Sequence, residues 1–140
     1  MSTLTQIPYC PPAVSAVFET YPPQAKDLLL AVRTLVFDTA ANLKNVGAVT
    51  ETLKWGEPAY LTKSGTTIRL AWSPKRADSV GLFVNCQTTL VETWREHYGD
   101  QLNLVGNREI RLFLDQTPTE APLRHCIAMA LTYHRRKLAR

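Results

Sequence analysis

The sequence predicts an α+β fold, in which an antiparallel sheet of about five strands carries long helices from the amino-terminal and carboxyl-terminal parts of the chain on one face. Near both ends, apolar residues recur at intervals of three and four positions, which is the period of an amphipathic helix. In the middle of the chain they alternate with polar residues, as in a strand. Helices and strands do not succeed one another regularly, so a parallel sheet is not expected.

A single domain is expected over residues 1–140. A chain of 140 residues can enclose one hydrophobic core but is too short for two domains of ordinary size. Hydrophobic residues make up 45% of the chain and charged residues 20%, which excludes a disordered chain. Residues 1–12 contain three prolines and are expected to be an irregular lead-in.

Two helices are expected after the lead-in. Residues 13–20 can form two helical turns before Pro22 and Pro23 end them, because proline lacks an amide hydrogen and restricts the residue before it. A helix of about twenty residues then begins near Gln24 and ends before Gly47. Its apolar stripe consists of Leu28, Leu29, Val32, Leu35, Val36, Ala40 and Leu43.

The middle of the chain is expected to form three or four antiparallel strands in meander order. The segments with strand character are residues 49–54, 59–63, 66–73 and 79–85. Trp55-Gly56-Glu57-Pro58 is expected to bend the chain, since glycine is free in φ and proline holds the preceding residue extended. Ser64-Gly65 is expected to be a two-residue hairpin turn with a positive φ at the glycine.

A short helix, a further strand and a final helix complete the expected fold. The short helix covers residues 89–98 and ends at Gly99, and the strand covers residues 108–114, where Ile110 and Leu112 alternate with polar residues. The final helix begins near Pro118. It is expected to bury Leu123, Ile127, Ala130, Leu131 and Leu138.

Alternation along the strands predicts the two faces of the sheet. The core face would collect Ala59, Leu61, Ile68, Leu70, Trp72, Val80, Leu82, Val84, Ile110 and Leu112. The opposite face would collect Tyr60, Arg69, Phe83, Arg111 and Phe113. Aromatic rings between guanidinium groups can hold an anion or a partner protein, but arginine stems can also simply cover rings on a solvated sheet. A register slip of one residue would exchange the two faces.

The sequence contains none of the local motifs of common metal sites or enzymes. His97, His125 and His134 are too far apart in sequence for a preformed zinc motif, and the six glycines are scattered singly, so they cannot build a phosphate-binding loop. We therefore predict no catalytic residues, no metal site and no cofactor, although an active site gathered from distant residues stays open. Cys10, Cys86 and Cys126 cannot all pair within one chain, which fits a cytoplasmic protein.

The net charge of +4 is concentrated near the carboxyl end. Up to residue 100 the acidic and basic residues balance, so the excess lies in the remainder, including Arg135, Arg136, Lys137 and Arg140. These four can stabilise the end of the final helix through its dipole, or they can form a phosphate-binding patch. No nucleic-acid recognition motif accompanies them, so nucleic acid is not an expected partner. No apolar stretch has the length of a membrane span, and no membrane association is expected.

One motif links the chain to a known family. Trp55-Gly56-Glu57-Pro58-Ala59-Tyr60, followed by a hairpin, the strand Val80–Phe83, the strand Arg108–Phe113 and a carboxyl-terminal helix, resembles the YdhG-like family of small bacterial domains of unknown function. The resemblance spans a core of about residues 22–138. It implies a frataxin-like fold and, for part of the family, a role as an intracellular iron chaperone.

The charge pattern differs from that of a frataxin-like iron surface. Between residues 22 and 44 the only acids are Asp27 and Asp38, and basic residues balance them. An iron site would have to be built from scattered carboxylates such as Glu51, Glu57, Glu92 and Glu96.

The leading hypothesis is a non-enzymatic binding module for a small anionic ligand or a partner protein. Its binding face would contain Trp55, Glu57, Tyr60, Arg69, Phe83, Arg108, Arg111 and Phe113. The alternative is an iron-binding chaperone of the frataxin type. The ligand and the oligomeric state are not predicted.

Overall fold

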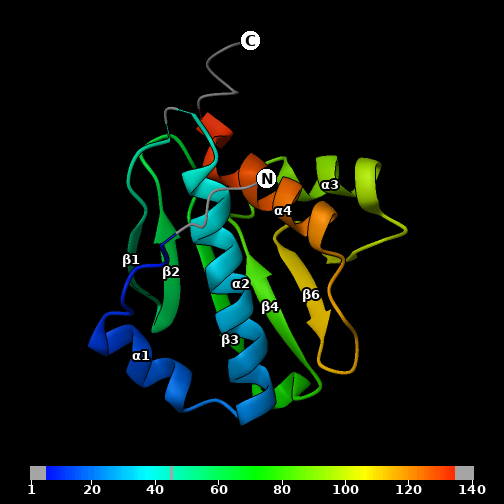
Figure 1. Cartoon of the computed structure of the whole chain (residues 1–140). Coiled ribbons are helices and arrows are strands. Elements are labelled where there is room, and N and C mark those ends of the chain that lie inside the picture. Colours follow the sequence, from blue (N-terminus) through cyan, green and yellow to red (C-terminus); the bar gives the residue numbers. More distant parts are fainter. Residues whose placement is uncertain (1–5, 45, 135–140) are drawn as a thin grey trace.

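The computed structural model describes residues 6–44 and 46–134. In this part of the chain the helices are α1 (Pro12–Glu19), α2 (Pro23–Ala41), α3 (Leu90–Tyr98) and α4 (Glu120–Leu131), with a short 3-10 helix at Pro74–Arg76. The strands are β1 (Thr50–Lys54), β2 (Glu57–Leu61), β3 (Ile68–Trp72), β4 (Ser79–Phe83), β5 (Asn103–Val105) and β6 (Glu109–Phe113). Figure 1 shows α2 running across the sheet, with α4 beside the carboxyl-terminal part of α2.

Within the described residues, the six strands form one antiparallel sheet in the order β1-β2-β3-β4-β6-β5. The predicted α+β class is confirmed, and the sheet has six strands where about five were expected. The additional strand, β5, has three residues and turns into β6 at Gly106, whose φ is 59°. Three residues are too few to display an alternating pattern, so periodicity does not reveal this strand.

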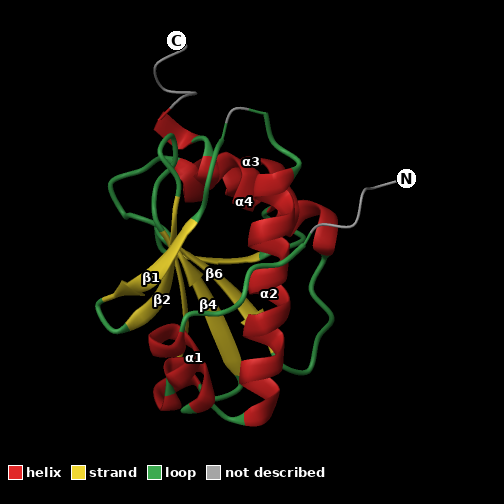
Figure 2. Cartoon of the chain, turned by 60° about the vertical axis from the view of Figure 1, so that its left-hand side comes forward, coloured by secondary structure: helices red, strands yellow, loops and turns green. Residues whose placement is uncertain are grey.

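The four described helices contribute to one core with one face of the sheet. Val14 and Phe18 of α1, the apolar stripe of α2, Trp94 of α3 and Ile127 of α4 belong to the same apolar cluster as the inward side chains of the strands. Those inward side chains include Ile68, Leu70, Val80, Leu82, Val84, Ile110 and Leu112, as predicted. Figure 2 shows the helices gathered on this side of the sheet, and no α-helix of the described residues covers the other face. We call that other side the open face.

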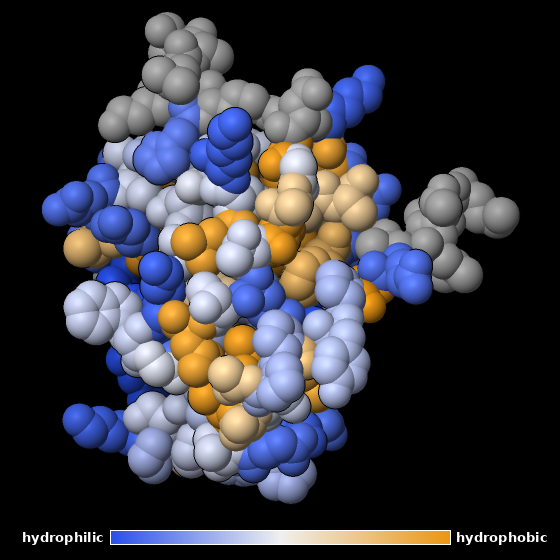
Figure 3. Space-filling view, turned by 90° about the vertical axis from the view of Figure 1, so that its left-hand side faces the viewer, coloured by the Kyte–Doolittle hydropathy of each residue, from blue (hydrophilic) through white to orange (hydrophobic). Residues whose placement is uncertain are grey.

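The edge of the core reaches the surface beside β1. Figure 3 looks at this side of the molecule and shows a central band of hydrophobic side chains bordered by hydrophilic ones. Since β1 is the last strand of the sheet, no further strand covers the core here. Val49 and Leu53 pack against the core but stay partly exposed.

The tight hairpin turn lies at Trp55-Gly56 and not at Ser64-Gly65. Lys54 is paired with Glu57, so only two residues connect β1 to β2. Trp55 and Gly56 have φ values of 56° and 76°, and positive φ at both central residues defines the type I′ turn that joins closely paired strands. The predicted bend at residues 55–58 is therefore a hairpin turn, and β2 begins at Glu57, two residues earlier than expected.

The segment between β2 and β3 instead holds the carboxyl end of α4. The Oγ1 of Thr62 donates to the carbonyl of Leu131 at 2.8 Å, and the amide of Thr66 donates to the carbonyl of Ala130 at 2.9 Å. These bonds satisfy carbonyls that the end of a helix leaves unpaired. A Cβ at Gly65 would come within 2.6 Å of the Ala130 carbonyl oxygen. The glycine is needed for this close approach and not for the predicted positive φ.

The register of β2 corrects the predicted faces of the sheet. Tyr60 pairs with Ile68 and points into the core, whereas Ala59 pairs with Arg69 and lies on the open face. Tyr60 was predicted beside Arg69, and Ala59 and Leu61 were predicted in the core. These three predictions are wrong. A register shift of one residue moves every side chain of a strand to the opposite face, because successive side chains point to opposite faces.

Two further observations bear on the sequence predictions. No helix of the described ranges is long and apolar enough to cross a membrane. Leu138 and the basic residues Arg135, Arg136, Lys137 and Arg140 lie outside the described residues.

Candidate functional site

The structure separates the predicted site residues into three places. Glu57, Arg69, Phe83, Arg111 and Phe113 lie on the open face, as their pairing registers show. Trp55 and Arg108 lie next to one edge of that face and line a pocket together with Arg69. Tyr60 lies on the opposite side of the sheet.

The centre of the open face is an aromatic ring between two guanidinium groups. The Cζ of Arg69 lies 5.6 Å from the centroid of the Phe83 ring, and the Cζ of Arg111 lies 6.0 Å from it. The ring lies over Gly81, where a Cβ would come within 2.5 Å of a ring carbon. Glycine at this position of β4 therefore lets the Phe83 ring lie flat on the sheet.

Both arginines of this central group already form ion pairs with carboxylates of the same sheet. Arg69 donates from Nη1 to Oε1 of Glu57 at 2.6 Å, and Arg111 donates from Nε to Oε2 of Glu109 at 2.6 Å. Arg111 and Glu109 are both buried, and Arg76 also binds Glu109 at 3.0 Å. A buried and paired Arg111 offers less to an external anion than an unpaired, exposed cation does. The alternative that the arginines cover the ring describes this centre better.

On the core side, Tyr60 belongs to a buried polar cluster that sequence reasoning missed. Its hydroxyl donates to Oε2 of Glu51 at 2.9 Å, and Glu51 also accepts two bonds from Arg33. Burial and the neighbouring carboxylate raise the pKa of Tyr60 far above its usual value. Tyr60 is completely buried, so it does not contact a ligand on the open face.

A signal for this cluster is present in the sequence. Arg33 falls within the apolar stripe of α2, four positions after Leu29, and Glu51 falls between Val49 and Leu53 at strand spacing. A cation and a carboxylate at two positions that patterning assigns to the core are expected to pair with each other.

A polar pocket opens where the β1–β2 turn meets the end of β4. We call it the edge pocket; its volume is about 340 Å³, and it is lined by Lys54, Trp55, Thr66, Thr67, Arg69, Val84, Asn85, Cys86 and Arg108. Three of these residues, Trp55, Arg69 and Arg108, were predicted as site residues from the sequence. The turn between β1 and β2 places Trp55 at the pocket. Arg108 lies beside the end of β4, because its carbonyl accepts a hydrogen bond from the Val84 amide at 2.8 Å.

The edge pocket has cationic groups available to a ligand. Lys54 and Arg108 are both exposed, and the side chain of neither forms a hydrogen bond or ion pair with another residue of the described chain. Arg69 is the third cation and is held by Glu57. The hydroxyls of Thr66 and Thr67 add neutral groups that can donate to an anion. Within residues 6–44 and 46–134, no carboxylate and no histidine belongs to the lining.

Trp55 is the most unusual residue of this pocket. Its side chain is 91% exposed, although tryptophan is a large apolar residue. Its backbone is in the left-handed region, which a bulky side chain rarely adopts. Strained residues of this kind cluster at ligand-binding sites.

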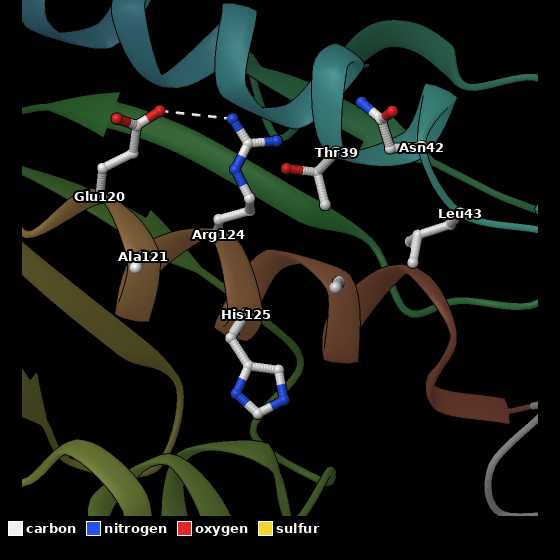
Figure 4. A pocket seen from close by; sticks show the side chains of 8 residues that line it. Thr39, Asn42, Leu43, Glu120, Ala121, Arg124 and His125 are labelled. Carbon is white, nitrogen blue, oxygen red and sulfur yellow. Dashed lines mark hydrogen bonds and ion pairs between the residues drawn. The ribbon is translucent and has the colours of Figure 1, made fainter. Parts of the chain in front are cut away.

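Another cavity, of about 520 Å³, lies between α2 and α4 (Figure 4). Its charged groups are already paired, since Arg124 binds Asp38 at 2.7 Å and Glu120 at 3.3 Å. His125 points away from Thr39 and Arg124 in Figure 4 and forms a 2.6 Å hydrogen bond with the hydroxyl of Tyr98. The Thr39 hydroxyl is buried and has no hydrogen-bond partner among the described residues. This cavity offers less to an anion than the edge pocket does.

The carboxylates considered for iron are not brought together. Glu51 is bound to Arg33 and Glu57 to Arg69, whereas Glu92 and Glu96 lie exposed on α3. The described residues contain no group of three or more His, Cys, Asp or Glu side chains that could hold a metal ion.

Comparison with family models, curated proteins and solved structures finds no match to this chain. The resemblance to the YdhG-like family is therefore an expectation from the sequence alone, and the geometry of the edge pocket carries the functional proposal.

Proposed function

We propose that this protein is a non-enzymatic binding module for a small anionic ligand, which it holds in the edge pocket. The observation that carries the proposal is the convergence of Lys54, Arg69 and Arg108 on one cavity, with two of the three cations unpaired within the described chain. Charge-assisted hydrogen bonds to carboxylate or phosphate are stronger than neutral ones. An anion entering here would gain such bonds without displacing a carboxylate from Lys54 or Arg108.

The lining favours binding over catalysis. Proton transfer or activation of a nucleophile requires a base within hydrogen-bond reach. The edge pocket contains the thiol of Cys86 but neither a histidine nor a carboxylate that could serve as that base. The groups that remain are hydrogen-bond donors and an indole ring, which bind a ligand and do not transform it.

We also propose membership of the YdhG-like family. The WGEPAY motif supports it, and this motif has three separate tasks in the fold. Trp55 and Gly56 form the turn, Glu57 holds Arg69, and Tyr60 fills the core.

Calorimetric titration with inorganic phosphate and with malonate at low ionic strength tests the binding function. The double variant Lys54→Ala plus Arg108→Ala is expected to lose most of the affinity. The matched control is Lys63→Ala plus Lys75→Ala, which removes the same charge from exposed positions outside the pocket. Raising the salt concentration is expected to weaken binding, since exposed charges are screened. Equal affinity in the two double variants would show that the edge pocket is not the anion site.

A further inference from the structure

The exposed ring of Trp55 lies on the wall of the cationic pocket, and the proposed anion site does not account for it. Lys54 and Arg108 suffice to attract an anion, and a bare phosphate or carboxylate could use only the N–H of the indole and not its flat face. The indole does provide a flat apolar surface at the rim of the cavity. A ligand that uses the whole lining must therefore contain both a negative group and a flat ring.

The backbone conformation of Trp55 also supports a role of its ring in ligand binding. A two-residue type I′ turn favours Asn-Gly or Asp-Gly, because small polar residues tolerate positive φ. Here tryptophan occupies the first position with φ 56°, and packing does not explain its presence, since the side chain is 91% exposed. The two-residue turn fixes the backbone at Trp55, so the indole projects from a defined position next to Lys54, as suits a stacking surface.

We propose that the ligand of the edge pocket is an aromatic phosphate of the nucleoside monophosphate type. Its base stacks on the indole of Trp55, and its phosphate lies between Lys54 and Arg108. This proposal rests on the anion-binding function proposed above. A cavity of about 340 Å³ lies at the lower end of the range of ligand pockets, which suits one ring and one phosphate better than a dinucleotide.

Stacking of a base on an aromatic side chain strengthens binding without selecting one base over another. Besides the three cations and the Cys86 thiol, the polar side chains of the lining are Thr66, Thr67 and Asn85. They are placed to meet the sugar or the polar edge of the base, so the preference among bases is expected to be small.

The test compares adenosine monophosphate, ribose 5-phosphate, inorganic phosphate and adenosine by calorimetry on the full chain. Adenosine monophosphate is expected to bind at least about fivefold more tightly than ribose 5-phosphate, the gain that stacking of one base gives. Trp55→Asn, which suits the turn, is expected to abolish this gain, so that the variant binds adenosine monophosphate and ribose 5-phosphate with similar affinity. Trp55→Phe keeps an aromatic face and is expected to retain part of the gain.

The outcomes separate this proposal from the one on which it rests. Equal affinity for adenosine monophosphate and ribose 5-phosphate would overturn the stacking proposal and leave anion binding in place. Binding of neither phosphate would overturn both. Adenosine binding as tightly as adenosine monophosphate would show that the phosphate is not recognised, and it would also overturn the proposal. If Trp55→Asn does not fold, loss of the gain in Trp55→Ala with retention in Trp55→Phe gives the same answer.

Discussion

Arg33 and Glu51 form a two-point ion pair inside the molecule, with Nε to Oε2 at 2.6 Å and Nη2 to Oε1 at 2.9 Å. Their side chains are 8% and 5% exposed. Arg33 also donates to the carbonyl of Pro8 at 2.7 Å, and its guanidinium lies 5.0 Å from the ring centroid of Phe37. The pair thus joins the lead-in, α2 and β1, and it attaches the edge strand to the helical layer.

Arg33→Met is expected to lower the free energy of unfolding by about 3–5 kcal/mol, because it leaves the buried Glu51 carboxylate without its cation. The double variant Arg33→Met plus Glu51→Leu is expected to recover most of this loss, since it removes both charges. Urea unfolding measures both effects. Equal destabilisation by the single and the double variant would show that the lost packing matters more than the uncompensated charge.

Trp55→Asn is expected to stabilise the protein by about 1 kcal/mol, because asparagine adopts the left-handed conformation more readily than tryptophan. Trp55→Ala also removes the ring, but alanine lacks the short polar side chain that lets asparagine adopt this φ, so no stabilisation is expected from it. Gly56→Ala is expected to destabilise the protein, since Gly56 has φ 76°. Thermal melting measures all three. A lower melting temperature for Trp55→Asn would mean that the indole contributes to folding and is not held there against it.

The two hairpin regions show what the sequence could and could not predict. Strand-like alternation correctly located β3, β4 and β6 and the side chains they place in the core. Two segments contain a glycine at a possible turn, Trp55-Gly56 and Ser64-Gly65. The two-residue turn was predicted at Ser64-Gly65, whereas it lies at Trp55-Gly56. Tryptophan is rare at positive φ, so its preference argued against the turn that the structure contains. Because the tight turn lies at Trp55-Gly56, the register of β2 differs by one residue from the predicted one. Tyr60 therefore faces the core and Ala59 the open face, the reverse of the prediction.

The candidate site was predicted in part, for a related reason. Arg69 and Arg108 were recognised as cations near the sheet, but nothing local in the sequence shows which cation has a carboxylate partner. Glu109 lies two residues before Arg111 on the same face of β6, and this spacing is the one available sign that Arg111 is occupied. Lys54 and Cys86 join the site only because the hairpin and the end of β4 meet in space, a long-range relationship that periodicity does not contain.

Gly65→Ala is expected to destabilise the protein more than Gly81→Ala does. A Cβ at Gly65 would come within 2.5 Å of the Leu131 carbonyl oxygen and 2.6 Å of that of Ala130. These oxygens are backbone atoms at the end of α4 and cannot rotate away, so a cost of about 1–3 kcal/mol or more is expected. A Cβ at Gly81 would meet the Phe83 ring, which can swing aside.

The control for this comparison is Phe83→Ala. Gly81→Ala is expected to cost less in the Phe83→Ala background than in the parent protein, because the ring that obstructs the new methyl group is gone. Chemical unfolding of the four proteins gives the coupling energy. A coupling near zero would contradict the placement of the ring over Gly81.

The free energy of unfolding is expected to fall at alkaline pH, because the buried Cys126 thiol loses its proton more readily in the unfolded chain than in the folded one. Burial raises the pKa of the Cys126 thiol from 9.0 to about 12. Between these values the unfolded chain releases the thiol proton while the folded chain keeps it, so the free energy of unfolding falls as pH rises, by at most about 1.4 kcal/mol per pH unit. Below pH 9 this contribution is complete. Urea unfolding from pH 7 to pH 11 should show a shallower alkaline decline for Cys126→Ala, and an unchanged one for Cys86→Ala, since Cys86 is exposed. The same slope in parent and Cys126→Ala would show that the thiol is not protected by the fold.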